Sequence, residues 1–294
     1  MLDLKDLDCL LALTRHRHFA RAAEHCGMSQ PAFSMRIRNL EERLGTQIVK
    51  RGNRFQGLTE AGETVVSHAR EILGGVRALE EELSAARGEV VGALTIGAIP
   101  TAAAYAAHAA NRLRKAHPGI RTRIDTATSL LVQQGVDEGR FDAGLTYLEG
   151  VATDLLKVEP LYDEEYVLLA PGVLLEAGVE AITWEEAAAL PLILLEREMQ
   201  NRRILDEIFA EVGAHPSIIA ETSGFIAAIT MAREGMGATV LPRVMIETLG
   251  DLRGTVLLPL VEPVIAKPVG LVTPKRTQSI PVVEALRRIV APEL

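Results

Sequence analysis

The stretch that decides the N-terminal fold runs from residue 19 to residue 45 and reads FARAAEHCGMSQPAFSMRIRNLEERLG. Small alanines between Phe19 and His25 predict a short helix that can pack closely against a neighbour. Gly27 then supplies a turn, because glycine tolerates the left-handed backbone that ends many helices.

A longer helix is predicted directly after this turn, from about Gln30 to Leu44. Ser29 is a favoured N-cap residue, and Pro31 falls in the first turn, where its missing N–H costs little. Gly45 ends the helix. One apolar face follows the helical period through Phe33, Ile37, Leu40 and Leu44. A short helix, a glycine-containing turn and a longer helix make up the helix-turn-helix arrangement.

The flanking segments complete a small DNA-binding domain. Leucines at helical spacing predict an amphipathic helix over residues 4–14. Residues 46–59 are predicted to form a short β-hairpin, the wing, whose Gly52-Asn53 turn carries Arg51 and Arg54 near its tip.

The charge distribution agrees with DNA binding at one end of the chain. The 294 residues carry a net charge of −8. Residues 1–60 hold ten Lys/Arg and seven Asp/Glu, giving +3, so the remainder holds 21 and 32, giving −11. A basic head on an acidic body permits contact with DNA through the head only.

Several protein classes are not supported by the sequence. No run of 18 apolar residues and no secretory signal is present, so a cytoplasmic protein without membrane association is expected. Two cysteines cannot build a disulfide framework or a cysteine-rich metal site. The seven histidines form no His-Glu-x-x-His motif, and neither a Gly-x-Ser-x-Gly elbow nor a phosphate-binding loop occurs. We therefore expect no enzyme, no cofactor and no metal.

A long helix is predicted to follow the wing from Thr59. Its apolar residues recur at alternating steps of four and three, which is the seam of a coiled coil. The seam residues are Val65, Ala69, Ile72, Val76, Leu79, Leu83 and Ala86. An amphipathic helix packed on its own domain would show a similar stripe, but the length and narrowness of this one favour a dimer seam.

From residue 93 onward, apolar strand-like runs alternate with helical segments. Such alternation predicts an α/β domain with mostly parallel sheets. About 200 residues are enough for two lobes. The fold class expected for the whole chain is therefore multidomain, with an α+β head and an α/β body.

The helix-turn-helix stretch resembles the LysR-type transcriptional regulators. The resemblance rests on Ala-Ala-Glu, Ser-Gln-Pro-Ala-x-Ser and Leu-Glu-x-x-Leu-Gly in the stretch quoted above, followed by Leu-Thr-x-Ala-Gly at residues 58–62. Departures from the family pattern fall at cap or core positions, namely His18, Cys26 and Ile48-Val49. The recognition helix itself is unaffected.

The resemblance implies three parts. These are a winged helix-turn-helix over 1–60, a coiled-coil linker helix over 61–90, and an effector-binding domain over 91–294 like a periplasmic binding protein. Lobe one would comprise 93–164 and 268–294, and lobe two 165–267, with crossovers near Asp163–Tyr166 and Ala266–Pro268. The resemblance also implies a homodimer or homotetramer on double-stranded DNA, a small-molecule effector and possible contact with RNA polymerase.

The first turns of a recognition helix reach base edges in the major groove. Gln30 suits adenine, Pro31 and Ala32 suit thymine methyl groups, and Ser34 suits a base or a phosphate. Arginines of this helix and of the wing suit guanine, phosphate or the minor groove. The expected DNA-binding residues are Gln30, Pro31, Ala32, Ser34, Arg36, Arg38, Arg51 and Arg54. Arg43 is expected to pair with nearby acids instead.

Hydroxyl residues at strand-to-helix junctions are the candidates for effector binding, because a helix N-terminus with a Ser or Thr hydroxyl suits an anion. Plain helix capping would use the same residues. The expected effector-binding residues are Thr101, Thr128 and Ser129, followed by Tyr147, Glu196, Met199, Asn201 and Thr222. An anionic metabolite is favoured, with formate or another small carboxylate as one suggestion, while a neutral or cationic ligand stays open.

Two alternative functions remain at this point. Cys9 and Cys26 could make the chain a redox-responsive regulator, although both occupy apolar positions where a thiol usually acts as a buried hydrophobe. A ligand-binding protein without DNA function would lack a reason for the helix-turn-helix stretch.

Overall fold

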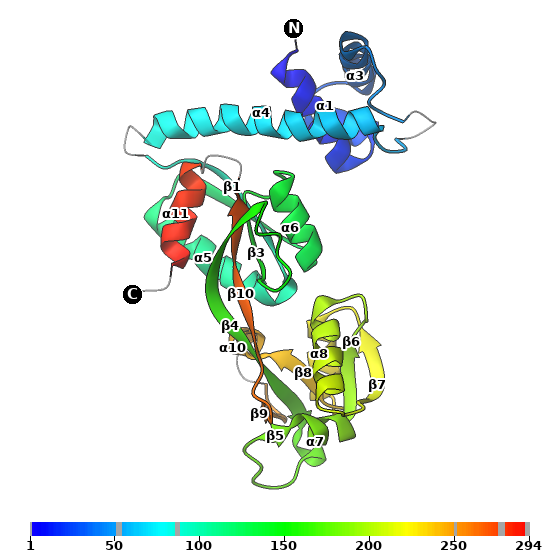
Figure 1. The fold of residues 1–294 in the computed structure, drawn as a ribbon, viewed down its shortest axis with the longest axis vertical. Helices are drawn as coiled ribbons and strands as arrows, with labels where there is room; N and C mark the ends of the chain where they lie inside the picture. The colour runs from blue at the N-terminus through cyan, green and yellow to red at the C-terminus, as the bar shows by residue number, and fades with distance from the viewer. Residues whose placement is uncertain (1, 51–54, 86–88, 250–251, 276–279, 292–294) are drawn as a thin grey trace.

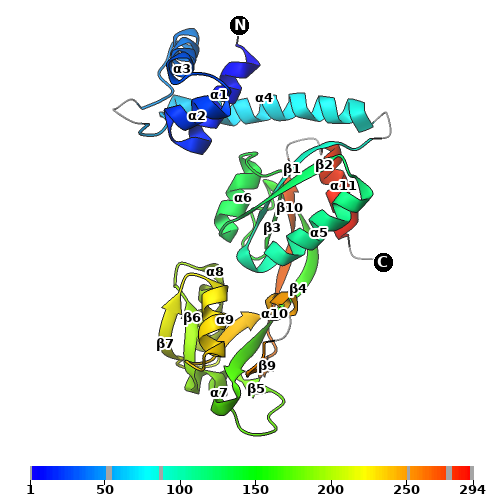
Figure 2. The same cartoon turned by 180° about the vertical axis from the view of Figure 1, so that it is seen from behind.

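The computed structural model describes residues 2–50, 55–85, 89–249, 252–275 and 280–291. The parts of the chain follow one another along its longest axis (Figure 1). The helix α4 (Glu60–Ala85) lies between the N-terminal helices on one side and the α/β part on the other, and Figure 2 shows the same order from behind.

The three N-terminal helices are α1 (Leu4–His16), α2 (Phe19–His25) and α3 (Gln30–Leu44). The predicted α2 and α3 are confirmed, because the local signals act as expected. The Ser29 side chain accepts a hydrogen bond from the backbone N–H of Ala32, and Gly45 ends α3 with φ 69°. The helices enclose a core formed by Leu10, Leu13, Ala22, Phe33, Ile37 and Leu40.

The segment after α3 turns back on itself. Val49 and Leu58 form an antiparallel bridge, and the N–H of Lys50 donates to the carbonyl of Gly57 at 2.9 Å. The hairpin base is thus present. The predicted tip, with Gly52-Asn53, Arg51 and Arg54, lies outside the described residues.

The helix α4 packs against the N-terminal core at its start, where Val66 belongs to the core cluster, and Ala69 in the next turn is also buried. Further along, Ile72, Leu79 and Leu83 are 44%, 58% and 57% exposed. The seam is therefore largely uncovered in a single chain. Its expected last residue, Ala86, lies outside the described residues.

The α/β part contains ten strands in the described residues, and eight of them join in one sheet. The sheet has the order β2-β1-β3-β10-β4-β9-β5, with β8 paired to β4, and β6 and β7 pair separately. The strands are β1 (Gly92–Ala98), β2 (Ile120–Thr126), β3 (Ala143–Tyr147), β4 (Leu156–Pro171), β5 (Ile182–Thr183), β6 (Pro191–Leu195), β7 (Ser217–Thr222), β8 (Thr239–Pro242), β9 (Thr255–Val261) and β10 (Ala266–Pro274).

Helices cover this sheet system on both sides. In the first lobe α5 and α11 pack together, and α6 lies against β3 and β10. The helices are η1 (Pro100–Ala102), α5 (Ala103–Ala116), α6 (Ser129–Asp137), η2 (Gly172–Leu174), α7 (Trp184–Ala189), α8 (Gln200–Glu211), α9 (Phe225–Arg233), α10 (Arg243–Leu249) and α11 (Pro281–Val290).

The expectation of mostly parallel sheets is wrong. Pairs β1–β2, β1–β3, β5–β9 and β6–β7 are parallel, whereas β10–β3, β10–β4, β4–β8 and β4–β9 are antiparallel. The reason is that the two longest connecting strands, β4 and β10, run in opposite directions through the middle of the sheet. Alternation of strands and helices along the sequence does not reveal these returning strands.

The two segments expected as crossovers lie side by side. Glu165 pairs with Ala266, Glu164 with Lys267 and Asp163 with Pro268 in the β4–β10 ladder. Both connections between the lobes therefore belong to one hydrogen-bonded ribbon, which Figure 1 shows as the long green and orange strands. None of the helices in the described ranges is long and apolar enough to cross a membrane.

A glycine fixes how α4 meets the hairpin base. A Cβ atom at Gly62 would lie 2.0 Å from the carbonyl oxygen of Ile48, whereas one at Gly75 of the same helix would meet nothing within 4 Å. We expect Gly62→Ala to lower the free energy of unfolding by about 1–3 kcal/mol, because backbone must shift.

Gly75→Ala is the matched control, and it should raise the stability of the helix by up to about 1 kcal/mol through helix propensity. Urea unfolding followed by far-UV circular dichroism measures both changes. Equal effects of the two substitutions would contradict the close approach at Gly62.

Candidate functional site

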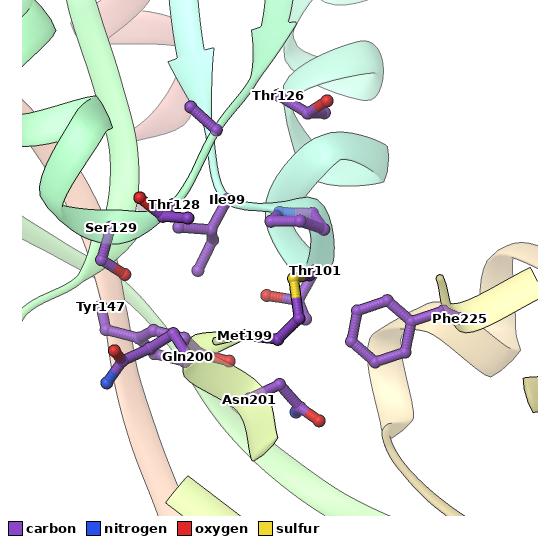
Figure 3. Close-up of a pocket in the computed structure, with 12 residues that line it drawn as sticks. Ile99, Thr101, Thr126, Thr128, Ser129, Tyr147, Met199, Gln200, Asn201 and Phe225 are labelled. Atoms are coloured by element: carbon purple, nitrogen blue, oxygen red, sulfur yellow. The ribbon is translucent and has the colours of Figure 1, made fainter. Parts of the chain in front are cut away.

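A cavity of about 230 Å³ lies between the two lobes. Figure 3 shows side chains converging on it from several helix starts. Ser129 and Tyr147 come from the first lobe, while Asn201 and Phe225 come from the second. The full lining is Ile99, Pro100, Thr101, Thr126, Ala127, Thr128, Ser129, Tyr147, Met199, Gln200, Asn201 and Phe225.

The N-termini of helices reach the cavity from both lobes. Thr128 caps α6 and accepts a hydrogen bond from the N–H of Leu131 at 3.4 Å. Met199 precedes α8 and Gly224 precedes α9, and neither provides a side-chain cap. First-turn N–H groups without such caps favour a negatively charged or hydrogen-bond-accepting ligand.

Buried polar atoms without partners lie in the cavity wall. Asn201 is only 4% exposed, and neither its amide nitrogen nor its amide oxygen has a hydrogen-bond partner. The Ser129 hydroxyl is also buried without a partner. Unpaired buried polar groups are costly, so this wall suits a polar ligand group or ordered water.

The structure brings together six of the eight residues expected to bind an effector. These are Thr101, Thr128, Ser129, Tyr147, Met199 and Asn201. Glu196 and Thr222 are not part of the lining, because they hold β6 and β7 together where the strands end. The N–H of Glu196 donates to the Thr222 carbonyl at 3.0 Å, and the Thr222 hydroxyl accepts from the N–H of Gly224 at 3.4 Å.

Of the apolar part of the wall, the expected residues included only Met199. Ile99 and Phe225 line the cavity, but isolated apolar residues carry no sequence signal that separates them from core. Gln200 could have been predicted, because it is a polar residue at the start of a helix, α8.

A buried acid, also missed, lies behind the cavity. Glu164 of β4 is 1% exposed, and the Tyr147 hydroxyl donates a short hydrogen bond to its Oε1 atom. Burial raises the pKa of Glu164 to about 7, against the opposing effect of the Tyr147 and Thr101 hydroxyls beside it. Burial and the neighbouring Glu164 charge also raise the pKa of Tyr147 well above its ordinary value.

A second surface is formed by the exposed side of α3. Gln30, Pro31, Ala32 and Arg38 are exposed, and Ser34 is half-buried. The Gln30 amide donates to the Ser34 hydroxyl at 3.4 Å. This side of the recognition helix is therefore free to approach DNA.

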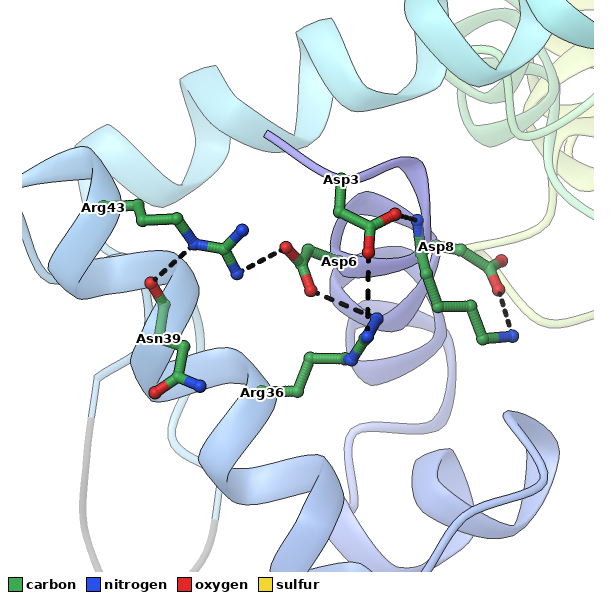
Figure 4. Close-up of polar contacts among 7 residues, drawn as sticks. Asp3, Asp6, Asp8, Arg36, Asn39 and Arg43 are labelled. Atoms are coloured by element: carbon green, nitrogen blue, oxygen red, sulfur yellow. Dashed lines mark hydrogen bonds and ion pairs between the residues drawn. The ribbon is translucent and has the colours of Figure 1, made fainter. Parts of the chain in front are cut away.

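Arg36 has a different environment. Figure 4 shows it beside α1, where its Nη1 atom lies 3.2 Å from Asp6 Oδ1 and its Nη2 atom 3.7 Å from Asp3 Oδ2. Arg43 Nη2 lies 2.6 Å from the other oxygen of Asp6, which confirms the expected pairing of Arg43 with an acid. Because Asp6 is 1% exposed, the two arginines neutralise a buried carboxylate and tie α3 to α1.

The two cysteines belong to the N-terminal core. Cys9 is fully buried and Cys26 packs at the edge of the same cluster. Burial raises the pKa of Cys9 to about 12, with Cys26 adding to the shift, so its thiol is protonated near neutral pH. No group of three or more His, Cys, Asp or Glu suited to a metal ion occurs in the described part of the chain.

Two family models match the chain. The model for "Bacterial regulatory helix-turn-helix protein, lysR family" matches residues 4–63, and that for "LysR substrate binding domain" matches residues 87–294. The DNA-binding transcriptional dual regulator OxyR of Escherichia coli K12 is 30% identical over 291 residues, covering 97% of this chain and 95% of that protein. The regulator AlsR of Bacillus subtilis is 30% identical over 247 residues, covering 82% and 80%.

Solved structures agree over the full length. A cysteine-to-aspartate variant of full-length OxyR from Pseudomonas aeruginosa has a TM-score of 0.78 at 25% identity, covering 99% of this chain and 98% of that one. CbnR in complex with its target DNA has a TM-score of 0.70 at 19% identity, covering 98% and 99%, and supports the fold. These relatives are regulators and not enzymes, and the chain belongs to the LysR-type family of DNA-binding transcriptional regulators.

Proposed function

We propose that a small carboxylate, bound in the cavity between the lobes, controls how this regulator binds or bends its DNA. The observation that carries the proposal is Asn201, which lines a cavity reached by helix N-termini and whose buried amide has no partner. No charged side chain lines this cavity in the described residues, so an anion would be held by neutral donors and helix ends.

The size and lining narrow the ligand further. A cavity of about 230 Å³ is smaller than the ~300–1,000 Å³ typical of drug-sized sites. Ile99, Met199 and Phe225 provide the apolar part of the lining. A carboxylate on a short apolar body, of roughly six to ten non-hydrogen atoms, therefore suits the site.

Redox sensing is the second candidate, because several similar proteins are named hydrogen peroxide-inducible genes activators. Residues 27–294 contain no cysteine, so no thiol is available in the α/β part. The buried, protonated Cys9 is a poor nucleophile, since the thiolate is the reactive form. These observations favour ligand binding over thiol oxidation.

For DNA recognition, we assign base contacts to Gln30, Pro31, Ala32 and Ser34, and a phosphate contact to Arg38. The exposure of this side of α3 supports the assignment. Arg36 already forms an ion pair with Asp6, so its expected contact with DNA would have to compete with that ion pair. The assigned contacts of Arg51 and Arg54 rest on the family resemblance alone.

A homodimer through α4 is the proposed assembly. Leu79 and Leu83 expose an apolar stripe that α4 does not bury on its own chain. The heptad spacing suits a second copy of the same helix. Pairing of dimers into a tetramer, and contact with RNA polymerase, follow from the resemblance only.

The carboxylate proposal can be tested with three probes of similar size and different charge: isobutyrate, isobutyramide and isobutylammonium. We expect isobutyrate to raise the thermal unfolding midpoint of the full chain most and isobutylammonium least. Asn201→Leu should weaken isobutyrate binding by about tenfold or more through loss of a donor.

Asn201→Leu should still fold, because an apolar group replaces an amide that has no partner in the unliganded protein. Thr222→Val is the matched control outside the lining and should leave isobutyrate binding unchanged. Strongest stabilisation by the ammonium probe would refute the proposed ligand class.

The DNA assignment predicts two different losses. Gln30→Ala should remove about 1–3 kcal/mol of discrimination at one base position. Arg38→Ala should weaken all sequences alike and lower the salt slope by about 1, because a phosphate contact carries no sequence information. Fluorescence anisotropy with matched and mismatched duplexes at several salt concentrations distinguishes the two, and identical profiles would contradict the division of roles.

The dimer proposal predicts that Leu79→Glu raises the dimer dissociation constant by at least about a hundredfold. A dimer of the substituted protein would have to bury two carboxylates in its apolar seam, at a cost of several kcal/mol. Light scattering against the monomer mass of 31.8 kDa measures the assembly. Val173→Glu, at a site that is 89% exposed and away from α4, is the control and should change nothing.

A further inference from the structure

Glu164 occupies an unusual position on the ribbon that joins the lobes. It lies on β4 in register with Lys267 of β10, where the strands pass from one lobe to the other. Its neighbours Asp163 and Glu165 are exposed, whereas Glu164 is 1% exposed and turned inward. The alternation of a strand thus places one acid of three inside the protein.

The partners of Glu164 leave its charge uncompensated. Oε1 accepts the Tyr147 hydroxyl, and Oε2 has no hydrogen-bond partner. No lysine, arginine or histidine in the described ranges forms an ion pair with Glu164. The ammonium group of Lys267, which pairs with Glu164 in the strand ladder, lies 2.9 Å from Glu149 Oε1 instead.

The other titratable groups around Glu164 are tyrosines of the same cluster. Tyr162 and Tyr166 of β4 have buried hydroxyls without partners, and burial, with a smaller contribution from the charge of Glu164, raises the pKa of each. Tyr105 of α5 contacts Tyr162 through ring centroids 5.2 Å apart. Because neutral tyrosines do not offset a carboxylate, burial brings the pKa of Glu164 to about 7.

The protonation state of Glu164 decides whether the Tyr147 hydroxyl can donate its hydrogen to a ligand in the cavity. A phenol has one hydrogen to donate. With Glu164 ionised, this hydrogen is held by the carboxylate behind the cavity wall. With Glu164 protonated, the acid can itself donate to the Tyr147 oxygen, and the phenol hydrogen becomes free for a ligand.

We propose that Glu164 couples the binding of a carboxylate in the cavity to the uptake of one proton from solvent. The bound anion and the added proton enter together, so the buried site gains no net charge. Glu164 acts as a positioning residue, because it touches the ligand only through Tyr147. This inference rests on the proposed carboxylate site and adds proton linkage to it.

The linkage has a definite sign. Protonated Glu164 favours the carboxylate, so affinity should be highest below the pKa of Glu164 and fall as the pH rises through about 7. The limiting loss above that value is about tenfold per pH unit for one linked proton. Isobutyramide, which carries no charge, should show a much weaker dependence.

The test uses calorimetry of isobutyrate on the full chain between about pH 6 and pH 8.5, in buffers of different ionisation enthalpy that report proton uptake. We expect uptake to approach one proton per bound isobutyrate at the higher pH. Glu164→Gln should bind isobutyrate with little pH dependence and no such uptake, because the amide is neutral and can donate to Tyr147. Asp163→Asn, the exposed neighbour, should behave like the unsubstituted protein.

If the role of Glu164 were purely structural, Glu164→Gln would instead weaken isobutyrate binding at every pH. Isobutyrate binding without proton uptake would overturn the coupling while leaving the carboxylate site intact. No isobutyrate binding at any pH would overturn the carboxylate site and the coupling with it. Infrared spectroscopy supplies a check without ligand: a carboxylic-acid carbonyl band, absent in Glu164→Gln, should disappear as the pH rises through about 7, and its absence at pH 6 would also overturn the coupling.

Discussion

The hydrogen-bonded ribbon of β4 and β10 is the constraint on which the effector part of the structure depends. It pairs from Leu156 with Pro274 to Glu165 with Ala266, and a bulge falls between Val269 and Gly270. At Gly270 a Cβ atom would lie 2.4 Å from the carbonyl oxygen of Glu159, so the strands approach too closely there for a side chain. Any change in the angle between the lobes has to be absorbed by this ribbon, because both crossovers belong to it.

The first lobe is joined to the linker helix by charged contacts. Arg77 of α4 forms a short ion pair with Asp142, whose other oxygen accepts the N–H of Thr95 in β1 at 2.7 Å. Arg70 lies 3.5 Å from Glu138 at the end of α6. The helix α6 begins at the cavity, at Thr128 and Ser129. One end of this helix therefore faces the proposed ligand and the other contacts the helix that carries the DNA-binding head.

Local signals made the head predictable, and long-range contacts limited the rest. The helix α3 could be placed to the residue because Ser29, Pro31 and Gly45 act through their own backbone and nearest neighbours. The pairing of Arg36 with Asp6 depends on how α1 crosses α3, which no spacing within α3 encodes.

The α/β part shows the same division. Thr128 and Ser129 were found because hydroxyl residues at helix starts have a local signature, and both line the cavity. Thr222 has that signature too, but its hydroxyl is used within the turn that it begins. Glu164 was missed because Asp163-Glu164-Glu165 has the composition of an exposed strand end. Its burial beside Tyr147 of β3 depends on the tertiary structure, which the local sequence does not encode.

Membership of the family establishes the fold and DNA binding, but it does not identify the signal that a member responds to. Relatives at 30% identity include activators named for hydrogen peroxide, yet this chain has no thiol after Cys26. A ligand bound in the α/β part can shift a conformational equilibrium only by its different affinity for the two states. The cavity meets that requirement because Ser129 and Asn201 belong to different lobes and both lack partners. A small ligand that satisfies both side chains at once would stabilise one separation of the lobes over all others.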